Sequence, residues 1–331
     1  GGSIASSEQL TLRGMRFVNN TSLQNPGGAI SANAGSLRVE QTDFTGNTAS
    51  HATSGRGGAL RVAGGATATI IASNFDNNTA VTYGGAMAVD NLSSASISTS
   101  RFQGDHANAD GGAVDANGGA QATILQSLIS GNSATQGGGL SVRDGSSSMD
   151  VQQSTLVANQ ASSNGGGWVA GNGATATGVN LTFSSNVASG EGGAMYLSGA
   201  ATLGSLTGST LFGNQATGTG KAVRALNATL LLDNALLEDN GVAGNLCVGA
   251  SISASAGTVA DDASCNGGVV SEALMLDPVL ANNGGATPTH LPLRGTAATD
   301  VAATCASLIV DQRGLPRPSG AGRCDAGAVE I

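Results

Sequence analysis

Lysine, aromatic side chains and long apolar runs are what this chain of 331 residues most lacks. It contains a single lysine, Lys221, while aromatic residues make up 3% and charged residues 11% of the sequence. With a formal net charge of -9, this scarcity of cations excludes nucleic acid and anionic lipid as partners, because both require a basic surface. No apolar run reaches the roughly eighteen residues of a transmembrane helix, and the first residues do not resemble a signal peptide. We expect no membrane insertion by this segment.

Cysteine is also rare, and all four cysteines lie in the last third of the chain, as Cys247 with Cys265 and Cys305 with Cys324. Neither pair has the CxxC spacing of zinc or redox sites, so the pattern predicts two local disulfides and an oxidising compartment. Each bridge would contribute about 3 kcal/mol in the chain-entropy model. The alternative is four reduced structural thiols. We expect no metal ion and no cofactor.

Glycine is abundant, with 52 residues, and much of it belongs to a recurring word, Gly-Gly-Ala-apolar, which alternates with a second word, Phe-x-x-Asn. The first word ends at Ile30, Leu60, Met87, Val114 and Met195. The Phe position of the second word falls at residues 17, 44, 75, 102, 129, 156, 183, 211 and 237, in steps of 27, 31, 27, 27, 27, 27, 28 and 26. A fixed period in this range indicates stacked copies of one structural unit.

Each repeat contains short apolar-x-apolar pairs, which are typical of strands with one buried face. One pair precedes the Phe position, as Leu37 and Val39, and another follows the glycines, as Leu60 and Val62. With a strand at the Phe position itself, each repeat supplies three short strands that stack on their own copies. The sequence therefore predicts an all-β fold, a right-handed parallel β-helix of about ten rungs of roughly 27 residues with a C-terminal disulfide-stapled cap.

The other recurring positions of the repeat suit the corners of such a helix. A hydroxyl residue two positions before the Phe, such as Ser73, can bond to nearby backbone. The Asn of the second word can adopt left-handed backbone and bond to its copies in adjacent rungs. The paired glycines suit a corner with positive φ or with crowded backbone. These residues are predicted to be scaffold.

The two words resemble the repeats of chlamydial polymorphic outer membrane proteins, and residues 1–240 carry this likeness. Residues 241–331 are expected to form the C-terminal rungs and a capping domain. Four blocks within them, at residues 276–280, 282–290, 311–314 and 324–330, resemble the bacterial choice-of-anchor Q domain. The resemblance implies a secreted or surface-attached bacterial β-helix, and it supplies no catalytic residue. We expect Asp311 and Arg313 to cap the stack and His290 to have a hydrogen-bonding structural role.

Polysaccharide lyases and hydrolases also use parallel β-helices, and their chemistry needs clustered carboxylates, usually with Arg or Lys. In register, Asp90, Asn117 and Arg143 form neighbouring positions of one outward column, with Asp115 alongside. His106 and Asp110 are expected in the preceding loop. Asp90, Asp115 and Arg143 are therefore the catalytic candidates. The alternative is a solvated Asp90–Arg143 ion pair of little energetic value.

Aromatic platforms for sugar are scarce in this sequence. Trp168 falls at an inward position and is expected in the core, which leaves Tyr83 and Tyr196 as the candidate outward contacts. This scarcity and the single lysine favour a non-enzymatic extracellular or cell-surface role, structural or adhesive, over glycan cleavage.

The segment Gly1-Gly2-Ser3-Ile4 resembles a copy of the first word one period before Ile30. It predicts an open rung at which a second copy could dock. We therefore expect head-to-tail association of the chain with itself into filaments. Glycans and a host or cell surface are the other candidate partners.

Overall fold

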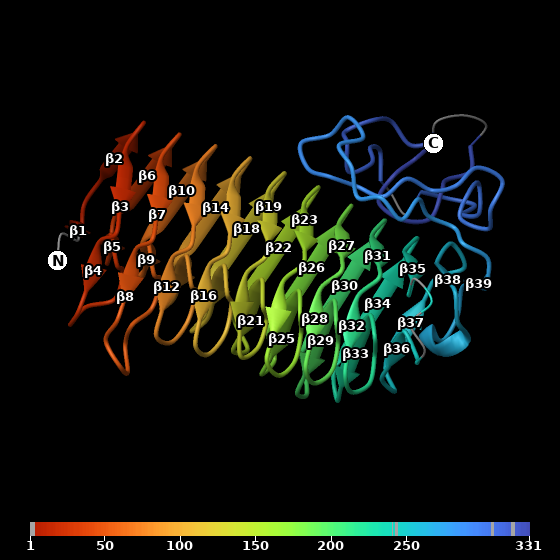
Figure 1. Cartoon of the computed structure of the whole chain (residues 1–331), viewed down its shortest axis with the longest axis horizontal. Coiled ribbons are helices and arrows are strands. Elements are labelled where there is room, and N and C mark those ends of the chain that lie inside the picture. The colour runs from red at the N-terminus through yellow and green to blue at the C-terminus, as the bar shows by residue number, and fades with distance from the viewer. Residues whose placement is uncertain (1–3, 240, 242–243, 306–307, 319–321) are drawn as a thin grey trace.

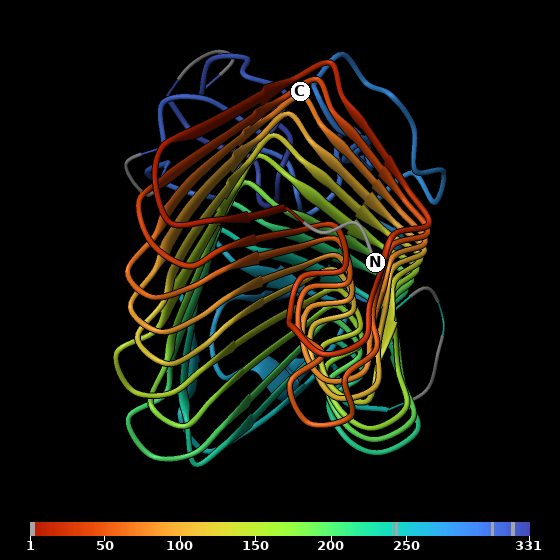
Figure 2. The same ribbon diagram turned by 90° about the vertical axis from the view of Figure 1, so that its left-hand side faces the viewer.

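The computed structural model describes residues 4–239, 241, 244–305, 308–318 and 322–331. Its strands form four sheets that run along one solenoid, and from β1 to β38 each strand pairs in parallel with its copy in the adjacent turn, as Figure 1 shows. There are about nine turns of about 27 residues, and the view from the N-terminal end in Figure 2 shows successive turns lying over one another. The prediction of a parallel β-helix is confirmed.

Sheet A follows the paired glycines and provides the wall on which the charged cluster described below is built. Its first and third side chains point into the core, so Leu60 and Val62 are fully buried. Its ten strands are β1 (Ile4–Ser6), β5 (Ile30–Ala32), β9 (Leu60–Val62), β13 (Met87–Val89), β17 (Val114–Ala116), β21 (Leu140–Arg143), β25 (Trp168–Gly171), β29 (Met195–Ser198), β33 (Val223–Leu226) and β36 (Cys247–Val248).

Sheet B contains the longest strands and shows the clearest alternation of buried and exposed residues. In β10, Ala68 and Ile70 are buried while Thr67, Thr69 and Ile71 face outward. Its ten strands are β2 (Leu10–Arg13), β6 (Ser36–Glu40), β10 (Thr67–Ile71), β14 (Ser94–Ser98), β18 (Gln121–Leu125), β22 (Ser148–Gln152), β26 (Thr175–Val179), β30 (Leu203–Thr207), β34 (Thr229–Asp233) and β37 (Ile252–Ala254).

Sheet C carries the Phe position, which is the middle residue of each three-residue strand from β3 to β35 and whose side chain points inward. The rings of Phe17, Phe44, Phe75 and Phe102 stack with centroids 4.7 to 5.1 Å apart. Its eleven strands are β3 (Arg16–Val18), β7 (Asp43–Thr45), β11 (Asn74–Asp76), β15 (Arg101–Gln103), β19 (Leu128–Ser130), β23 (Thr155–Val157), β27 (Thr182–Ser184), β31 (Thr210–Phe212), β35 (Leu236–Glu238), β38 (Val259–Ala260) and β39 (Val269–Val270).

Sheet D was not expected, because its strands have only two residues and a period-2 pattern cannot be recognised over so short a length. Each strand follows the Asn of the second word and ends, from β8 onward, in a buried alanine. Its eight strands are β4 (Thr21–Ser22), β8 (Thr48–Ala49), β12 (Thr79–Ala80), β16 (His106–Ala107), β20 (Ser133–Ala134), β24 (Gln160–Ala161), β28 (Val187–Ala188) and β32 (Gln215–Ala216). Most turns therefore have four strands, where three were predicted.

The hydroxyl column behaves as predicted at the corner between sheets B and C. The Ser73 Oγ donates to the carbonyl oxygen of Ile71, 2.9 Å away in its own turn. It also accepts from the N–H of Thr42 in the preceding turn, at 3.2 Å. Each such hydroxyl therefore satisfies backbone groups of two turns at once.

The Asn column forms a continuous buried ladder between sheets C and D. The Asn132 Nδ2 donates to the Asn159 Oδ1 at 2.9 Å and to the carbonyl oxygen of Phe102 at 3.2 Å. The backbone N–H of Asn132 donates to the same Asn159 Oδ1 at 3.0 Å. The left-handed backbone predicted for the ladder residues lies one position earlier, at residues such as Asn77 and Ala158. That detail of the prediction is wrong.

The two glycines of each pair are required for different reasons. The first has positive φ, as at Gly57 with φ of 64°, which disfavours any residue with a Cβ. The second faces the next turn, where a Cβ on Gly58 would lie 2.1 Å from the carbonyl oxygen of Gly85. Both explanations offered for the glycine pair therefore apply, one to each residue.

The two predicted disulfides are present and staple different parts of the C-terminal region. The Cys247–Cys265 bridge ties β36 to the 3-10 helix η1 (Ala263–Cys265), and both cysteines belong to the main core beside Ile252. This bridge closes the last turn. The Cys305–Cys324 bridge lies in the tail that follows β39.

The tail from residue 271 onward lies along the outer face of sheet C, beside the C-terminal half of the stack in Figure 1. The carbonyl oxygen of Asp311 accepts a hydrogen bond from Gln153 Nε2, at 3.1 Å, next to β23. Arg313 pairs with Asp311 at 2.7 Å. The prediction that Asp311 and Arg313 cap the end of the stack is therefore wrong, because β23 lies several turns before the last.

Apolar residues on the outer positions of β31 and β35 explain why the tail docks there. Phe212 and Leu236 point away from the main core and pack with Val259, Met275 and Leu276 in a second buried cluster. The outer positions of the uncovered strands β7, β11 and β15 are instead polar and partly exposed. The apolar outer residues thus mark the part of the docking surface at β31 and β35, whereas the tail contacts β27 and the residues beside β23 through hydrogen bonds.

His290 has the hydrogen-bonding environment that was expected of it. Its Nε2 lies 2.9 Å from the Ser184 Oγ and its Nδ1 lies 2.8 Å from the carbonyl oxygen of Asp277. Burial lowers the pKa of His290 from its usual value. Since both ring nitrogens are engaged within the protein, the residue fastens the tail to β27.

Candidate functional site

The candidate site is a cluster of charged side chains that we call the arginine–aspartate cluster. It contains Arg56, Arg61, Asp90, Asp110, Asp115 and Arg143, with Tyr83 and Asn117. Its residues come from two positions of the repeat that lie side by side in the solenoid. One is the outer face of sheet A and the residues that follow its strands, and the other is the residue immediately before each glycine pair.

The turn from sheet D to sheet A folds over the outer face of sheet A. The second residue of each sheet A strand points outward, but in several strands this turn buries it. Its exposure is 0%, 0% and 6% at Ala88, Ser141 and Tyr196. The residue before the glycine pair lies in this turn and faces the strand. Arg56, Tyr83 and Asp110 occupy that position in three successive turns.

Asp90 is held by two arginines of the preceding turn. Arg61 donates from Nε to the Asp90 Oδ2 at 3.0 Å and from Nη2 to the Asp90 Oδ1 at 2.9 Å. Arg56 Nη1 lies 3.5 Å from the same carboxylate. Asp90 does not form the predicted pair with Arg143, and it is fully buried rather than solvated.

Arg143 binds two other carboxylates. Its Nη1 lies 2.5 Å from the Asp110 Oδ2 and its Nη2 lies 3.6 Å from the Asp115 Oδ1. Asn117 links the two halves, because it donates from Nδ2 to Asp115 and accepts at Oδ1 from Arg56 at 3.3 Å. Asp90, Asp115 and Arg143, the three predicted candidates, thus lie in one cluster. Most of the side chains that connect them were not predicted.

Burial sets the protonation of this cluster. It raises the pKa of Asp115 to about 6, while Arg143 partly offsets the effect and Asp110 adds to it. Burial also raises the pKa of Asp110, against the influence of Arg143. For Arg143 itself burial would lower the pKa, but the two carboxylates outweigh it and the pKa is raised.

Access to these carboxylates is closed by their own partners. The side chains of Asp90 and Asp115 are 0% exposed, and the arginines that cover them are 16% to 28% exposed. Tyr83 is half-buried beneath the guanidinium groups of Arg56 and Arg143, at 4.9 and 4.5 Å from its ring centroid. A general acid or base must reach its substrate within hydrogen-bonding distance, and in this structure both carboxylates are covered by the arginines that bind them.

Arg56 and Arg61 are the members of the cluster that sequence reasoning missed, although the sequence carries a signal for Arg56. The step of 31 residues between Phe44 and Phe75 exceeds the usual 27, and the extra residues fall in the turn after β8. This longer turn, closed by a hydrogen bond from Gly55 N–H to the His51 carbonyl oxygen at 2.8 Å, carries Arg56 to Asp90 and Asn117.

The other candidates lie outside the cluster. His106 is on β16 in sheet D, and Trp168 is fully buried in the core as predicted. Tyr196 is buried, so the prediction of an outward contact there is wrong. Of the predicted self-association residues, Gly1, Gly2 and Ser3 lie outside the described residues, and Ile4 is partly buried at the start of β1.

Asp105 occupies the ladder position that follows Phe102, where the other turns carry Asn, and it cannot fully replace an Asn there. Its Oδ1 accepts from the N–H and Nδ2 of Asn78, at 2.8 and 2.9 Å. In the other turns, the Nδ2 group donates to a backbone carbonyl and to the next Asn Oδ1. Asp105 lacks that donor, its Oδ2 has no hydrogen-bond partner, and burial raises its pKa well above the usual value.

Replacement of Asp105 by Asn is therefore expected to stabilise the protein by about 1–3 kcal/mol at pH 7, since it restores a buried donor. Because the pKa of Asp105 is higher in the folded state, the wild-type protein loses stability as pH rises above about 4. The gain from the substitution should shrink toward pH 4. Urea unfolding at both pH values measures it, with Asp43→Asn on the outer face of β7 as the control. An equal effect at both pH values would contradict this account.

A second group of carboxylates lies near the last turn, around a cavity of about 390 Å³ lined by Asp239, Asp261, Asp262 and Glu272. Burial raises the pKa of Asp261 to about 7, although the N–H of Asp239 donates to it at 2.7 Å. Among the described residues, no three His, Cys, Asp or Glu side chains are arranged to hold a metal ion. No helix in the same residues is long and apolar enough to cross a membrane.

Comparison with known proteins adds no relative to this picture. No protein-family model matches the chain, and no curated protein or solved structure matches it either. The resemblance to polymorphic outer membrane protein repeats and to the choice-of-anchor Q domain therefore stays a prediction from motifs. The function must be inferred from the geometry of the chain itself.

Proposed function

We propose that this chain is a non-enzymatic β-helix outside the bacterial cell or on its surface, with a structural and adhesive role. The observation that carries the proposal is the closed arginine–aspartate cluster. Its three carboxylates and three arginines neutralise one another between adjacent turns. Charges that are used to fasten turns to strands are scaffold rather than catalytic machinery.

The location follows partly from the disulfides. Two disulfides and no free cysteine among the described residues indicate a compartment other than the cytoplasm. The finer assignment to the extracellular space or to a bacterial surface is part of the proposal, and the motif resemblance supports it.

Glycan cleavage by a lyase or hydrolase is the alternative. Asp115 gives it some support, because a carboxyl with a pKa of about 6 can hold a proton near neutral pH. We expect no release of products when the purified chain is incubated with neutral and acidic polysaccharides. Release that is lost in Asp90→Ala, Asp115→Asn or Arg143→Ala would establish the alternative and overturn the proposal.

Head-to-tail association is the remaining part of the proposal. Within the described residues, β1, β2 and β3 are the terminal strands of their sheets, and Ile4 and Leu10 are only partly buried. Such edges can pair with another chain. Sedimentation of the purified chain across a range of concentrations should show species that grow with concentration. A single species with the mass of one chain at all concentrations would contradict this part.

A further inference from the structure

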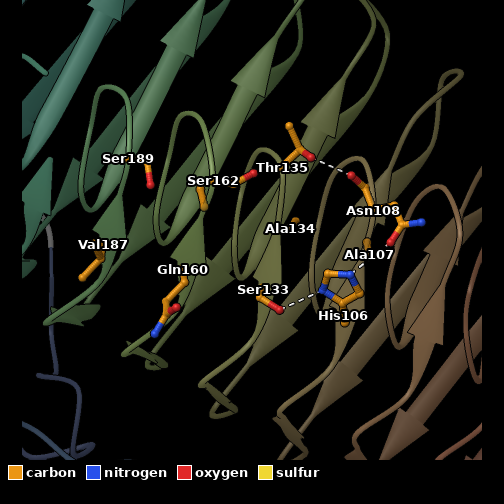
Figure 3. A pocket seen from close by; sticks show the side chains of 11 residues that line it. His106, Ala107, Asn108, Ser133, Ala134, Thr135, Gln160, Ser162, Val187 and Ser189 are labelled. Carbon is orange, nitrogen blue, oxygen red and sulfur yellow. Dashed lines mark hydrogen bonds between the residues drawn. The ribbon is translucent and has the colours of Figure 1, made fainter. Parts of the chain in front are cut away.

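A trough on the outer side of sheet D is a second surface feature, separate from the arginine–aspartate cluster. We call it the sheet D trough. It has a volume of about 420 Å³ and crosses four turns at β16, β20, β24 and β28, as Figure 3 shows. At the usual strand spacing these four turns extend over about 14 Å. The feature is therefore an elongated groove parallel to the solenoid axis.

Two rows of side chains, polar except for Val187, form its edges and repeat once per turn. One row contains His106, Ser133, Gln160 and Val187, which pair in register on adjacent strands. The floor between the rows is made of small alanines, such as Ala134, so that a flat ligand could approach the backbone closely.

The second row contains Asn108, Thr135, Ser162 and Ser189, two residues further along each turn. At the N-terminal end, side chains of the two rows bond to one another, with His106 Nε2 lying 3.0 Å from the Asn108 Oδ1. At the other end, the side chains of Gln160, Ser162 and Ser189 are exposed and have no hydrogen-bond partner among the described residues.

The chemistry of the trough excludes several classes of ligand. Its lining contains no Asp, Glu, Lys or Arg, so it cannot attract nucleic acid or an acidic polymer through charge. The strands β16 and β24 already pair on both sides, so a peptide cannot add to them as an extra strand. Val187 is the one large apolar side chain of the lining, which is too little for an amphipathic helix.

A linear, uncharged chain with many hydroxyl groups fits the polar lining and the elongated shape of the trough. We infer that the sheet D trough binds an uncharged, extended β-1,4-linked glycan, with its long axis parallel to the solenoid. Each turn advances by about 4.8 Å, which is close to the length of one sugar unit in such a chain. Successive sugars would then lie over successive turns, where their hydroxyl groups can bond to the polar side chains of the two rows. This inference rests on the proposed adhesive function and names its partner class.

Titration calorimetry with cellohexaose tests the inference. The comparison is between the wild-type chain, the double variant Gln160→Ala/Ser162→Ala, and the control Gln215→Ala. Gln215 occupies the same row on β32 and is exposed, but it lies outside the trough. The wild-type chain and the control should bind alike, and the double variant should bind at least tenfold more weakly. The exposed positions make loss of folding an unexpected outcome, which thermal unfolding of each variant checks.

Two results would overturn the inference, namely no saturable binding by the wild-type chain or equal binding by the double variant. Either result leaves the proposed function standing if the chain still adheres to cells or to other polysaccharides. Shortening of the cellohexaose in the same samples, detected by mass spectrometry, would instead overturn the non-enzymatic proposal. The two failures are therefore distinguishable.

Discussion

The variant Gly112→Ala should be among the most damaging single methyl additions in the solenoid. A Cβ at Gly112 would lie 2.1 Å from the carbonyl oxygen of Gly138 and 2.7 Å from the backbone nitrogen of Ser133. Both atoms belong to paired backbone of the next turn and cannot rotate away as a side-chain tip could. We expect a loss of at least about 3 kcal/mol, above the usual range for overpacking, or failure to fold.

Gly145→Ala is the matched control for this substitution. Its φ lies outside the left-handed region, and the nearest atom to an added Cβ is the carbonyl oxygen of Asn172 at 3.8 Å. This variant should unfold within about 0.5 kcal/mol of wild type, as surface substitutions usually do. Denaturant unfolding of both variants measures the difference. If the two variants unfold at similar denaturant midpoints, the close approach of adjacent turns is not the reason for a glycine at position 112.

The variant Asn159→Ala should have the second largest effect, because it breaks the buried ladder in the middle. The Asn159 Oδ1 accepts from both the N–H and the Nδ2 of Asn132. Its Nδ2 donates to the carbonyl oxygen of Ile129 at 3.0 Å. Each buried group left without a partner costs about 1–3 kcal/mol, so we expect a total loss of about 3–5 kcal/mol.

Asn74→Ala provides the comparison on the outer face of sheet C. Asn74 makes one side-chain hydrogen bond, from Nδ2 to the Asp43 Oδ1 at 2.8 Å, at a partly exposed position. Its loss should cost about 1 kcal/mol or less. Equal unfolding free energies for the two variants would mean that the ladder contributes no more than an ordinary surface contact.

The fold was predictable because the residues that stacking requires recur at the period of one turn. The Phe, Asn and hydroxyl columns each occupy the same structural position in successive turns, so their spacing gives the rung directly. Sheet D was not predictable in this way, since two residues such as His106 and Ala107 show no periodicity. Phe212 and Leu236 are apolar at outer positions, and their meaning became clear only once the structure showed the tail packed against them.

The candidate site was predictable in its carboxylates and in Arg143, but not in Arg56, Arg61 or the pairing of the charges. Register placed Asp90, Asp115 and Arg143 on neighbouring strands, and the structure brings them into one cluster. Their partners come from turns that fold back over sheet A, as Arg56 does, and no spacing rule gives the path of a turn. Burial of the cluster follows from that path, which is why the expectation of a solvated pair failed.

The pH dependence of stability combines opposite contributions from named residues. His290 has a lowered pKa, so it should reduce stability as pH falls below about 6.5. Asp115 has a raised pKa, so its contribution should fall as pH rises from about 4 to about 6. These opposing slopes make single-residue variants, such as Asp105→Asn, more informative than the profile of the wild-type chain.

The central claim is that the arginine–aspartate cluster is structural and that no substrate reaches its carboxylates. One measurement tests this claim most directly. The wild-type chain is incubated for days with a panel of neutral and acidic polysaccharides, and newly formed reducing ends and unsaturated products are quantified against a heat-denatured control. We predict no increase over the control for any polymer. Product release that disappears when Arg143 is replaced by Ala would contradict the claim, since it would show that the cluster opens to substrate.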